Sequence, residues 1–373
     1  SCKFTTIEDT ESSKILNHKD KFLANENGLI NHKNNDKFGS AASLNSIAAD
    51  EPDYLKLILT ARVYDTAIET PLTYARKLST KLKNSIYFKR EDMQPEIFSF
   101  KCRGAFNRMY NLSKEERERG VCCCSAGNHA QGVALAAQKL GIRAVIVMPK
   151  FAPDIKVSNV RRLGGEVVLE GYSLEDAKAK CKQLVAEQNL VFIPPFDDPY
   201  IIAGQGTAGV EILRQLRQDR LDAIFVCCGG GGLLSGIAAY VKRIRPEIKI
   251  IGVNTIDSDC MFQSLKKGEV VELPNVGIFA DGTAIKQVGY ETHRLCAKFV
   301  DDFVLVNNDE VCAAIKDAFD DTRVVLEPSG ALAIAGMKRY LQENSDIQGG
   351  VFCAVTSGAN MNFSRLGYVV ERC

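Results

Sequence analysis

The sequence predicts an α/β fold with two open, twisted, mostly parallel sheets flanked by helices, in which a larger domain is interrupted by a smaller one. Two observations lead to this prediction. From Ser113 onwards, apolar segments of strand length alternate with segments of helix length, a pattern typical of parallel sheets covered by helices. The strands also form two series, and a longer helical segment at residues 206–216 separates them. We therefore expect two sheets rather than one.

The two series of strands define the expected domains. The first predicts a small α/β domain at residues 114–191, and the second predicts a large domain formed by residues 51–113 and 192–373. Residues 1–50 are polar and rich in Asn, Lys and Ser, so we interpret them as a flexible leader, the remnant of a targeting region. Ligands commonly bind between two domains, so we expect the site there.

Each expected element follows from a local pattern. The strands are apolar runs bounded by turn residues, and the helices have apolar residues at intervals of three or four. One helix has a capping box from Ser113 to Glu116, and another ends at Leu163 before two glycines. The expected strands are residues 86–92, 121–124, 144–149, 166–171, 191–196, 223–228, 248–254, 303–307 and 351–357. The expected helices are residues 54–65, 100–112, 113–120, 131–141, one that ends at 163, 173–188, 206–216 and 233–244.

Composition excludes several classes of protein. The chain has 373 residues, of which 46% are hydrophobic and 25% charged, as in ordinary globular proteins. A net charge of +1 gives no electrostatic reason to expect nucleic acid or a membrane as partner. The thirteen cysteines include no C-x-x-C pair, and none of the four histidines has metal-ligand spacing from another, so we expect free thiols and no metal.

Lys101 is the first candidate for chemistry. We expect Ser99 to cap the helix that carries it, which places Lys101 in the first turn. A helix N-terminus disfavours an ammonium group, and Phe98, Phe100 and Phe106 are expected to exclude water from it. Both effects lower the pKa of a lysine and favour the free amine that attacks a carbonyl to form a Schiff base. The alternative is an ordinary solvated lysine.

A glycine tract lies between an expected strand and the helix that follows it. Backbone N–H groups there can approach an anion closely, with the helix dipole behind them, which makes a phosphate cradle. A dinucleotide-binding loop is the rival interpretation, but Ser235 stands where its third glycine is expected and Asn254 where its acidic residue is expected. A third interpretation is that the glycines only form a tight turn between the strand and the helix. The tract consists of Gly229, Gly230, Gly231, Gly232 and Leu233.

A second turn of small residues predicts a second anion site. Ser125, Ala126 and Gly127 leave backbone N–H groups free for a carboxylate, and the Asn128 amide can donate to a phenolic oxygen. His129 is more often a packed loop histidine than a catalytic base.

Ser357 ends the last apolar strand. Its hydroxyl is expected at the edge of the sheet where α/β proteins bind ligands, although a turn serine is an equal alternative. An amine nucleophile, a phosphate cradle, a carboxylate site and a ring partner together suit pyridoxal phosphate acting on an amino acid.

The motifs SFKCRGA, SAGNHAQG, GGGGL and TSGAN, with KREDMQP before them, resemble those of the fold-type II pyridoxal-phosphate enzymes. Over residues 50–373 the chain is most similar to the biosynthetic threonine deaminases of bacteria and plant plastids. This resemblance implies pyridoxal phosphate as cofactor, with Lys101 as its Schiff-base lysine and Phe100 beside it. It implies that Asn128 binds the ring oxygen O3′ and Ser357 the pyridine nitrogen. It also assigns the phosphate to residues 229–233 and the substrate carboxylate to residues 125–129.

The function implied is deamination of L-threonine to 2-oxobutanoate and ammonia, and more slowly of L-serine, in isoleucine biosynthesis. The resemblance implies a homo-oligomer in the plastid stroma, or otherwise in the cytoplasm. Because the sequence given ends at Cys373, we expect no regulatory domain and no inhibition by isoleucine. Ala126 stands where the related serine racemases have a serine that acts on the opposite face of Cα, so racemisation is not expected. The alternatives are a serine dehydratase, a cysteine synthase, a nicotinamide-dependent oxidoreductase and a non-catalytic amino-acid sensor.

Overall fold

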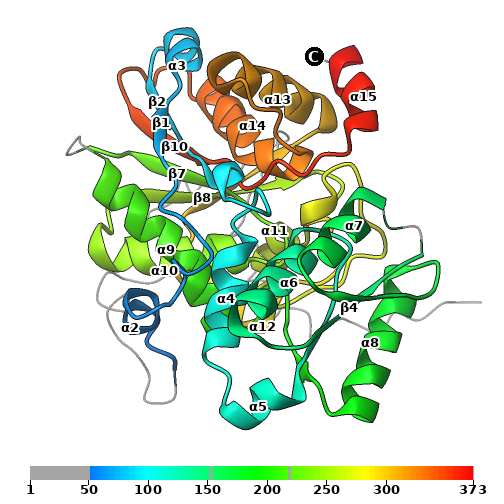
Figure 1. Cartoon of the computed structure of the whole chain (residues 1–373). Coiled ribbons are helices and arrows are strands. Elements are labelled where there is room, and N and C mark those ends of the chain that lie inside the picture. Colours follow the sequence, from blue (N-terminus) through cyan, green and yellow to red (C-terminus); the bar gives the residue numbers. More distant parts are fainter. Residues whose placement is uncertain (1–50, 151, 153, 217–219, 373) are drawn as a thin grey trace, which may run out of the picture.

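The computed structural model describes residues 51–150, 152, 154–216 and 220–372 (Figure 1). The leader expected at residues 1–50 lies outside the described residues. The expected fold class is confirmed: a six-stranded sheet has the order β1-β2-β10-β7-β8-β9, and a four-stranded sheet has the order β5-β4-β3-β6. Strand β1 is antiparallel to β2, and all the other pairs in the described residues are parallel.

The bounds of the elements are as follows. The strands are β1 (Leu72–Tyr74), β2 (Ser85–Lys89), β3 (Val121–Cys124), β4 (Ala144–Met148), β5 (Glu166–Leu169), β6 (Val191–Phe192), β7 (Ala223–Cys227), β8 (Lys249–Thr255), β9 (Asp302–Val306) and β10 (Val351–Val355). The α-helices are α2 (Tyr54–Leu59), α3 (Arg76–Leu82), α4 (Lys101–Tyr110), α5 (Lys114–Arg119), α6 (Asn128–Leu140), α7 (Asp154–Arg162), α8 (Leu174–Gln188), α9 (Pro199–Gln215), α10 (Gly232–Ile244), α11 (Cys260–Lys267), α12 (Tyr290–Phe299), α13 (Asn308–Thr322), α14 (Pro328–Glu343) and α15 (Leu366–Glu371). The short 3₁₀ helices are η1 (Glu91–Met93), η2 (Asp281–Thr283) and η3 (Phe363–Arg365).

Helices cover both faces of the larger sheet. In Figure 1, β7 and β8 run between α13 and α14 above and α9 and α10 below. Every residue of β7 and β10 is buried, as expected for central parallel strands covered on both faces. The four-stranded sheet is formed between Val121 and Phe192. The division into two domains stays a prediction.

Most expected elements are present and differ from the observed ones mainly at their ends, but the sequence patterns did not predict β1, α3, α11, α12, α13 or α15. The strand expected at 86–92 ends at Lys89. The strand expected at 191–196 stops at Phe192, because prolines follow two residues later and cannot donate to a ladder. The helix expected at 54–65 stops at Leu59. The capping box of α5 is confirmed, with the Ser113 hydroxyl accepting from the Glu116 N–H.

Glycines let α4 pack closely against two other helices. A Cβ added at Gly104 in α4 would lie 2.8 Å from the carbonyl oxygen of Ile201 in α9, and one at Gly204 would lie 2.7 Å from the Cα of Gly104. A Cβ at Gly132 in α6 would lie 2.9 Å from the carbonyl oxygen of Lys101. Any side chain at these positions would push the helices apart. Figure 1 shows α4 near the centre of the molecule.

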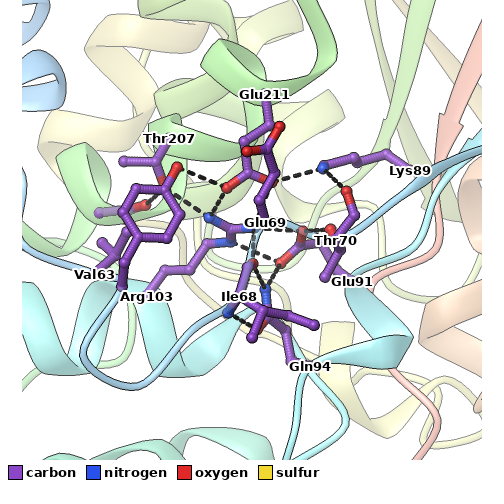
Figure 2. A network of polar contacts seen from close by, with 12 residues as sticks. Val63, Ile68, Glu69, Thr70, Lys89, Glu91, Gln94, Arg103, Thr207 and Glu211 are labelled. Atoms are coloured by element: carbon purple, nitrogen blue, oxygen red, sulfur yellow. Dashed lines mark hydrogen bonds and ion pairs between the residues drawn. The ribbon is translucent and has the colours of Figure 1, made fainter. Parts of the chain in front are cut away.

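A buried network of charges joins α4 to its surroundings (Figure 2). The Arg103 guanidinium pairs with Glu91, at 2.8 Å from Nε to Oε2, and with Glu211, at 2.6 Å from Nη1 to Oε1. Lys89 Nζ lies 2.6 Å from the other oxygen of Glu211, and all four side chains are fully buried. Burial acts to lower the pKa of Arg103, but the two carboxylates outweigh it and hold that pKa well above its ordinary value. The network ties α4 to η1, β2 and α9.

Neutral groups complete the hydrogen bonding of both carboxylates. The Thr70 hydroxyl and the Gln94 amide donate to Glu91. The Tyr64 hydroxyl donates to Glu211. A buried ion pair stabilises the fold only when the remaining lone pairs of the carboxylate also accept hydrogen bonds.

No helix in the described part of the chain is both long and apolar enough to cross a membrane.

Replacing Arg103 by methionine should lower the free energy of unfolding by about 3–5 kcal/mol, because two buried carboxylates lose their main partner. Urea denaturation followed by circular dichroism measures this change. The matched control is Arg143→Met, which breaks a half-exposed pair with Glu166 and should cost only about 0–1 kcal/mol. Equal losses in the two variants would show that the buried network contributes no more than a surface pair.

Candidate functional site

Lys101 is the first residue of α4, as expected. Its Nζ donates to the carbonyl oxygen of Pro195 at 2.7 Å and lies 5.3 Å from the centre of the Phe100 ring. The side chain is part-buried, and burial lowers the pKa of the amine to about 8. A substantial fraction of the amine is therefore unprotonated at slightly alkaline pH. Phe98 was expected to help exclude water, but its side chain is half exposed.

The expected cap at Ser99 is wrong. Phe100 is the residue before the helix, and the Ser99 hydroxyl has no hydrogen-bond partner among the described residues. Ser99 instead forms an antiparallel bridge with Gly358.

This bridge brings Ser357 next to the start of α4. The Phe100 N–H donates to the Ser357 carbonyl oxygen at 3.3 Å, and the Ala359 N–H donates to the Phe98 carbonyl oxygen at 3.0 Å. The Ser357 side chain is buried, and its hydroxyl donates to the carbonyl oxygen of Ser329 at 3.3 Å. The hydroxyl of Ser357 is thus fixed close to the segment that carries Lys101.

The glycine tract turns sharply between β7 and α10. Gly231 precedes the helix with φ = +96°, a conformation that side chains rarely adopt. The N–H groups of Gly229, Gly230, Gly231 and Gly232 have no hydrogen-bond partner among the described residues. A Cβ at Gly230 would lie 2.2 Å from the Phe196 ring. These free donors at a helix N-terminus fit a phosphate group.

Leu233 and Asn254 have structural roles beside this turn. The Leu233 side chain is buried in the core, so only its backbone is available to a ligand at the helix N-terminus. Asn254 is buried, and its amide donates to the Cys228 carbonyl oxygen at 2.6 Å. In a dinucleotide-binding fold, this position has a carboxylate that binds the ribose. Here Asn254 stabilises the glycine turn instead.

The second expected anion site lies between β3 and α6. Asn128 and His129 were expected in the turn, but they form the first turn of α6, with Gly127 as the preceding residue. The Gly127 N–H donates to the Ser125 hydroxyl at 3.2 Å, and a Cβ at Gly127 would meet nothing within 4 Å. Open space in front of a helix N-terminus, next to Ala126, fits a carboxylate.

His129 is a packed residue. It is buried, and its Nε2 lies 3.0 Å from the carbonyl oxygen of Ile193. Burial, together with the charge of Lys101, lowers the pKa of His129 to about 3. The ring is therefore neutral near pH 7, which does not suit a base that must gain a proton there.

Two connections between these groups were not foreseen from the sequence. Pro195 and Phe196 link Lys101 to the glycine turn, because one accepts from Lys101 Nζ and the other packs on Gly230. The buried carboxylate of Glu327 accepts from the Asn128 amide at 2.7 Å. No spacing in the sequence signals either connection, because each joins segments far apart in the chain.

The described residues that come together are an amine, a row of free N–H groups, a buried hydroxyl and a side-chain amide. This donor set fits pyridoxal phosphate, which needs a lysine, a phosphate cradle and ring partners. No group of three or more His, Cys, Asp or Glu side chains within the described ranges could hold a metal ion. The eleven cysteines described there are free, and all but Cys124 are buried.

Comparisons with known proteins agree with this chemistry. Residues 63–358 match the family described as "Pyridoxal-phosphate dependent enzyme". The chain is 55% identical to a mitochondrial threonine dehydratase of Schizosaccharomyces pombe, over 86% of this chain and 54% of that protein. It is also 55% identical to a chloroplastic biosynthetic threonine dehydratase of Solanum lycopersicum, over 86% of this chain and 52% of that protein.

A solved structure is similar over nearly all of both chains. It is the processed form of threonine deaminase isoform 2 from Solanum lycopersicum, with a TM-score of 0.84 and 49% identity. The alignment covers 90% of this chain and 89% of that chain.

The pKa of Lys101 predicts how its amine responds to pH. We expect the rate of Schiff-base formation with added pyridoxal phosphate to rise with pH up to about 8 and then to level off, because only the unprotonated amine attacks. Stopped-flow absorbance on cofactor-free protein measures this rate. Lys101→Ala, the control, should lack the fast phase. A rate that still rises beyond about pH 10, near the ordinary lysine pKa, would contradict a lowered pKa.

Proposed function

The chain belongs to the family of pyridoxal-phosphate dependent enzymes, and from this premise we propose that it deaminates L-threonine to 2-oxobutanoate and ammonia. The observation that carries the proposal is the part-buried amine of Lys101, held beside the glycine turn by Pro195 and Phe196. The names of the compared proteins support threonine as the substrate. The chain spans little more than half the length of the two threonine dehydratases, so the activity of the whole protein is part of the proposal.

The residues of the site have separate tasks in this proposal. The free N–H groups at Gly229 to Gly232 bind the cofactor phosphate, and those at the start of α6 bind the substrate carboxylate. When bound, the cofactor supplies a carbonyl for the substrate amine and a ring that withdraws electrons from Cα. Lys101 Nζ removes the Cα proton, and the β-hydroxyl takes up a proton and leaves as water. Water then hydrolyses the released imine to 2-oxobutanoate and ammonia. Ser357 would hold the pyridine nitrogen, and Phe100 would lie beside the ring.

Ala126 supports elimination over racemisation. Inversion at Cα needs a proton donor on the face opposite to Lys101, and the methyl group of Ala126 cannot supply one. We propose L-serine as a slower substrate, since it carries the same β-hydroxyl leaving group. A nicotinamide-dependent oxidoreductase has no support from the family match or from the buried Asn254.

Several finer expectations stay predictions. A plastid location is supported by the chloroplastic relative, whereas the other relative is mitochondrial. We also propose that the protein is a homo-oligomer and that isoleucine does not inhibit it; adding isoleucine to the assay below tests the second statement.

Purified protein with pyridoxal phosphate should release 2-oxobutanoate and ammonia from L-threonine in equal amounts. Lys101→Ala should lower kcat at least about 10²-fold, because the variant lacks the amine that takes the Cα proton. A coupled assay for the 2-oxo acid, with ammonia measured separately, tests both statements. Cofactor binding without release of either product would refute the proposed activity.

A further inference from the structure

The amide of Asn128 lies in a chain of hydrogen bonds with two residues that no part of the proposed function uses. Its Nδ2 donates to Glu327 Oε1 at 2.7 Å, and its Oδ1 accepts from Asn360 Nδ2 at 2.8 Å. Asn360 Nδ2 also donates to the carbonyl oxygen of Ile97 at 2.6 Å. Three segments far apart in the sequence therefore meet at one side chain: the start of α6, the residue before α14, and the segment after β10.

These contacts determine which way the Asn128 amide faces. When it is ionised, the Glu327 carboxylate only accepts, so the atom of Asn128 next to it must be the NH₂ group. The Ile97 carbonyl also only accepts, so the atom of Asn360 that faces it must be the NH₂ group. The same NH₂ group faces Asn128, so the atom of Asn128 on that side must be the amide oxygen. Both ends of the chain of hydrogen bonds require the same orientation.

One N–H of Asn128 remains after these contacts. Nδ2 has two hydrogens, and only the bond to Glu327 is made within the part of the chain that the structure describes. The remaining N–H is the only donor that the side chain can offer to a bound molecule. Rotation of the amide by 180° would replace it with an acceptor.

Glu327 is an unusual residue to find at this place. Its side chain is buried, and among the described residues its other oxygen accepts only from the backbone N–H of Asn360, at 3.2 Å. Burial, followed by the charge of Asp281, raises the pKa of Glu327 to about 7, and Lys156 acts in the opposite direction. Asp281 and Lys156 pair with each other at 2.8 Å.

A buried carboxylate without a cation directly bonded to it reduces stability, so a requirement other than stability accounts for it. The carboxylate sits where only an acceptor can orient the Asn128 amide.

We propose that Glu327 and Asn360 are positioning residues that fix the Asn128 amide so that its remaining N–H meets the phenolic oxygen of the cofactor ring. This inference rests on the proposed role of Asn128 in binding the cofactor. It goes beyond that role, because it assigns the orientation of the amide to two residues that have no task in the proposed function.

A double-mutant cycle tests the proposal through cofactor binding rather than turnover. The variants are Glu327→Gln, Asn128→Ala and the two combined. Glutamine has the shape of glutamate, but it places an NH₂ group against one of the two donors, Asn128 Nδ2 or the Asn360 N–H. The measured quantities are the Kd of pyridoxal phosphate for cofactor-free protein and the wavelength of the visible band, at about pH 9, above the pKa values of Glu327 and Lys101.

Glu327→Gln should weaken cofactor binding about three- to tenfold and shift the visible band, because a hydrogen bond to the ring oxygen is lost. In the Asn128→Ala background the same substitution should change Kd by less than about twofold, since Glu327 acts through Asn128. Asn360→Ala provides the second test if Glu327→Gln does not fold, and its effect should likewise vanish without Asn128. The matched control is Glu343→Gln at the far end of α14, where the carboxylate pairs with Arg339 and should leave Kd and the band unchanged.

Equal losses with and without Asn128 would overturn the proposal, because the role of Glu327 would then be structural only. No loss in Glu327→Gln would overturn it as well. Failure of the proposed function is a separate result: a protein that binds pyridoxal phosphate but does not deaminate threonine still gives a readable cycle.

Discussion

The site depends on the buried guanidinium of Arg103. Two carboxylates from η1 and α9 pair with it, and a lysine from β2 pairs with one of them in turn. Because Lys101 lies half a turn earlier on α4, the position of its amine follows from how Arg103 is held. The close contacts at Gly104 and Gly132 remove the remaining freedom, since backbone meets backbone there. The ion pairs of Arg103 and the close glycine contacts thus both fix the position of α4.

The two sheets account for the two proposed anion sites. Each sheet ends a strand in a turn that leads directly into a helix, β7 into α10 and β3 into α6. In parallel α/β sheets such turns lie at the carboxyl ends of the strands, where ligands bind. A helix N-terminus offers N–H groups that its own turn cannot satisfy, so each sheet contributes one of the proposed anion sites. Together they suit a substrate with a carboxylate and a cofactor with a phosphate.

Local sequence was sufficient for those parts of the fold whose causes are local. Apolar runs predicted the central strands, and the capping box of α5 was read directly from Ser113 and Glu116. The position of Lys101 at a helix start and the glycine turn were also predicted. The cap at Ser99 failed because its backbone pairs with Gly358, more than 250 residues away. For the same reason Glu327 and the partners of Arg103 could not be found, since buried carboxylates are recognised only by what surrounds them.

The burial of Lys101 also concerns the order of events during folding. Its neighbours at the site come from segments near residues 100, 195, 230 and 357, so they assemble only when distant parts of the chain have met. In the unfolded chain the amine has the ordinary lysine pKa and is mostly protonated at neutral pH. The preference of an aldehyde for Lys101 over the other lysines of this chain therefore arises only on folding. An aldehyde has no preferred lysine to react with on the unfolded chain. It reacts preferentially with Lys101 once the core around α4 has formed.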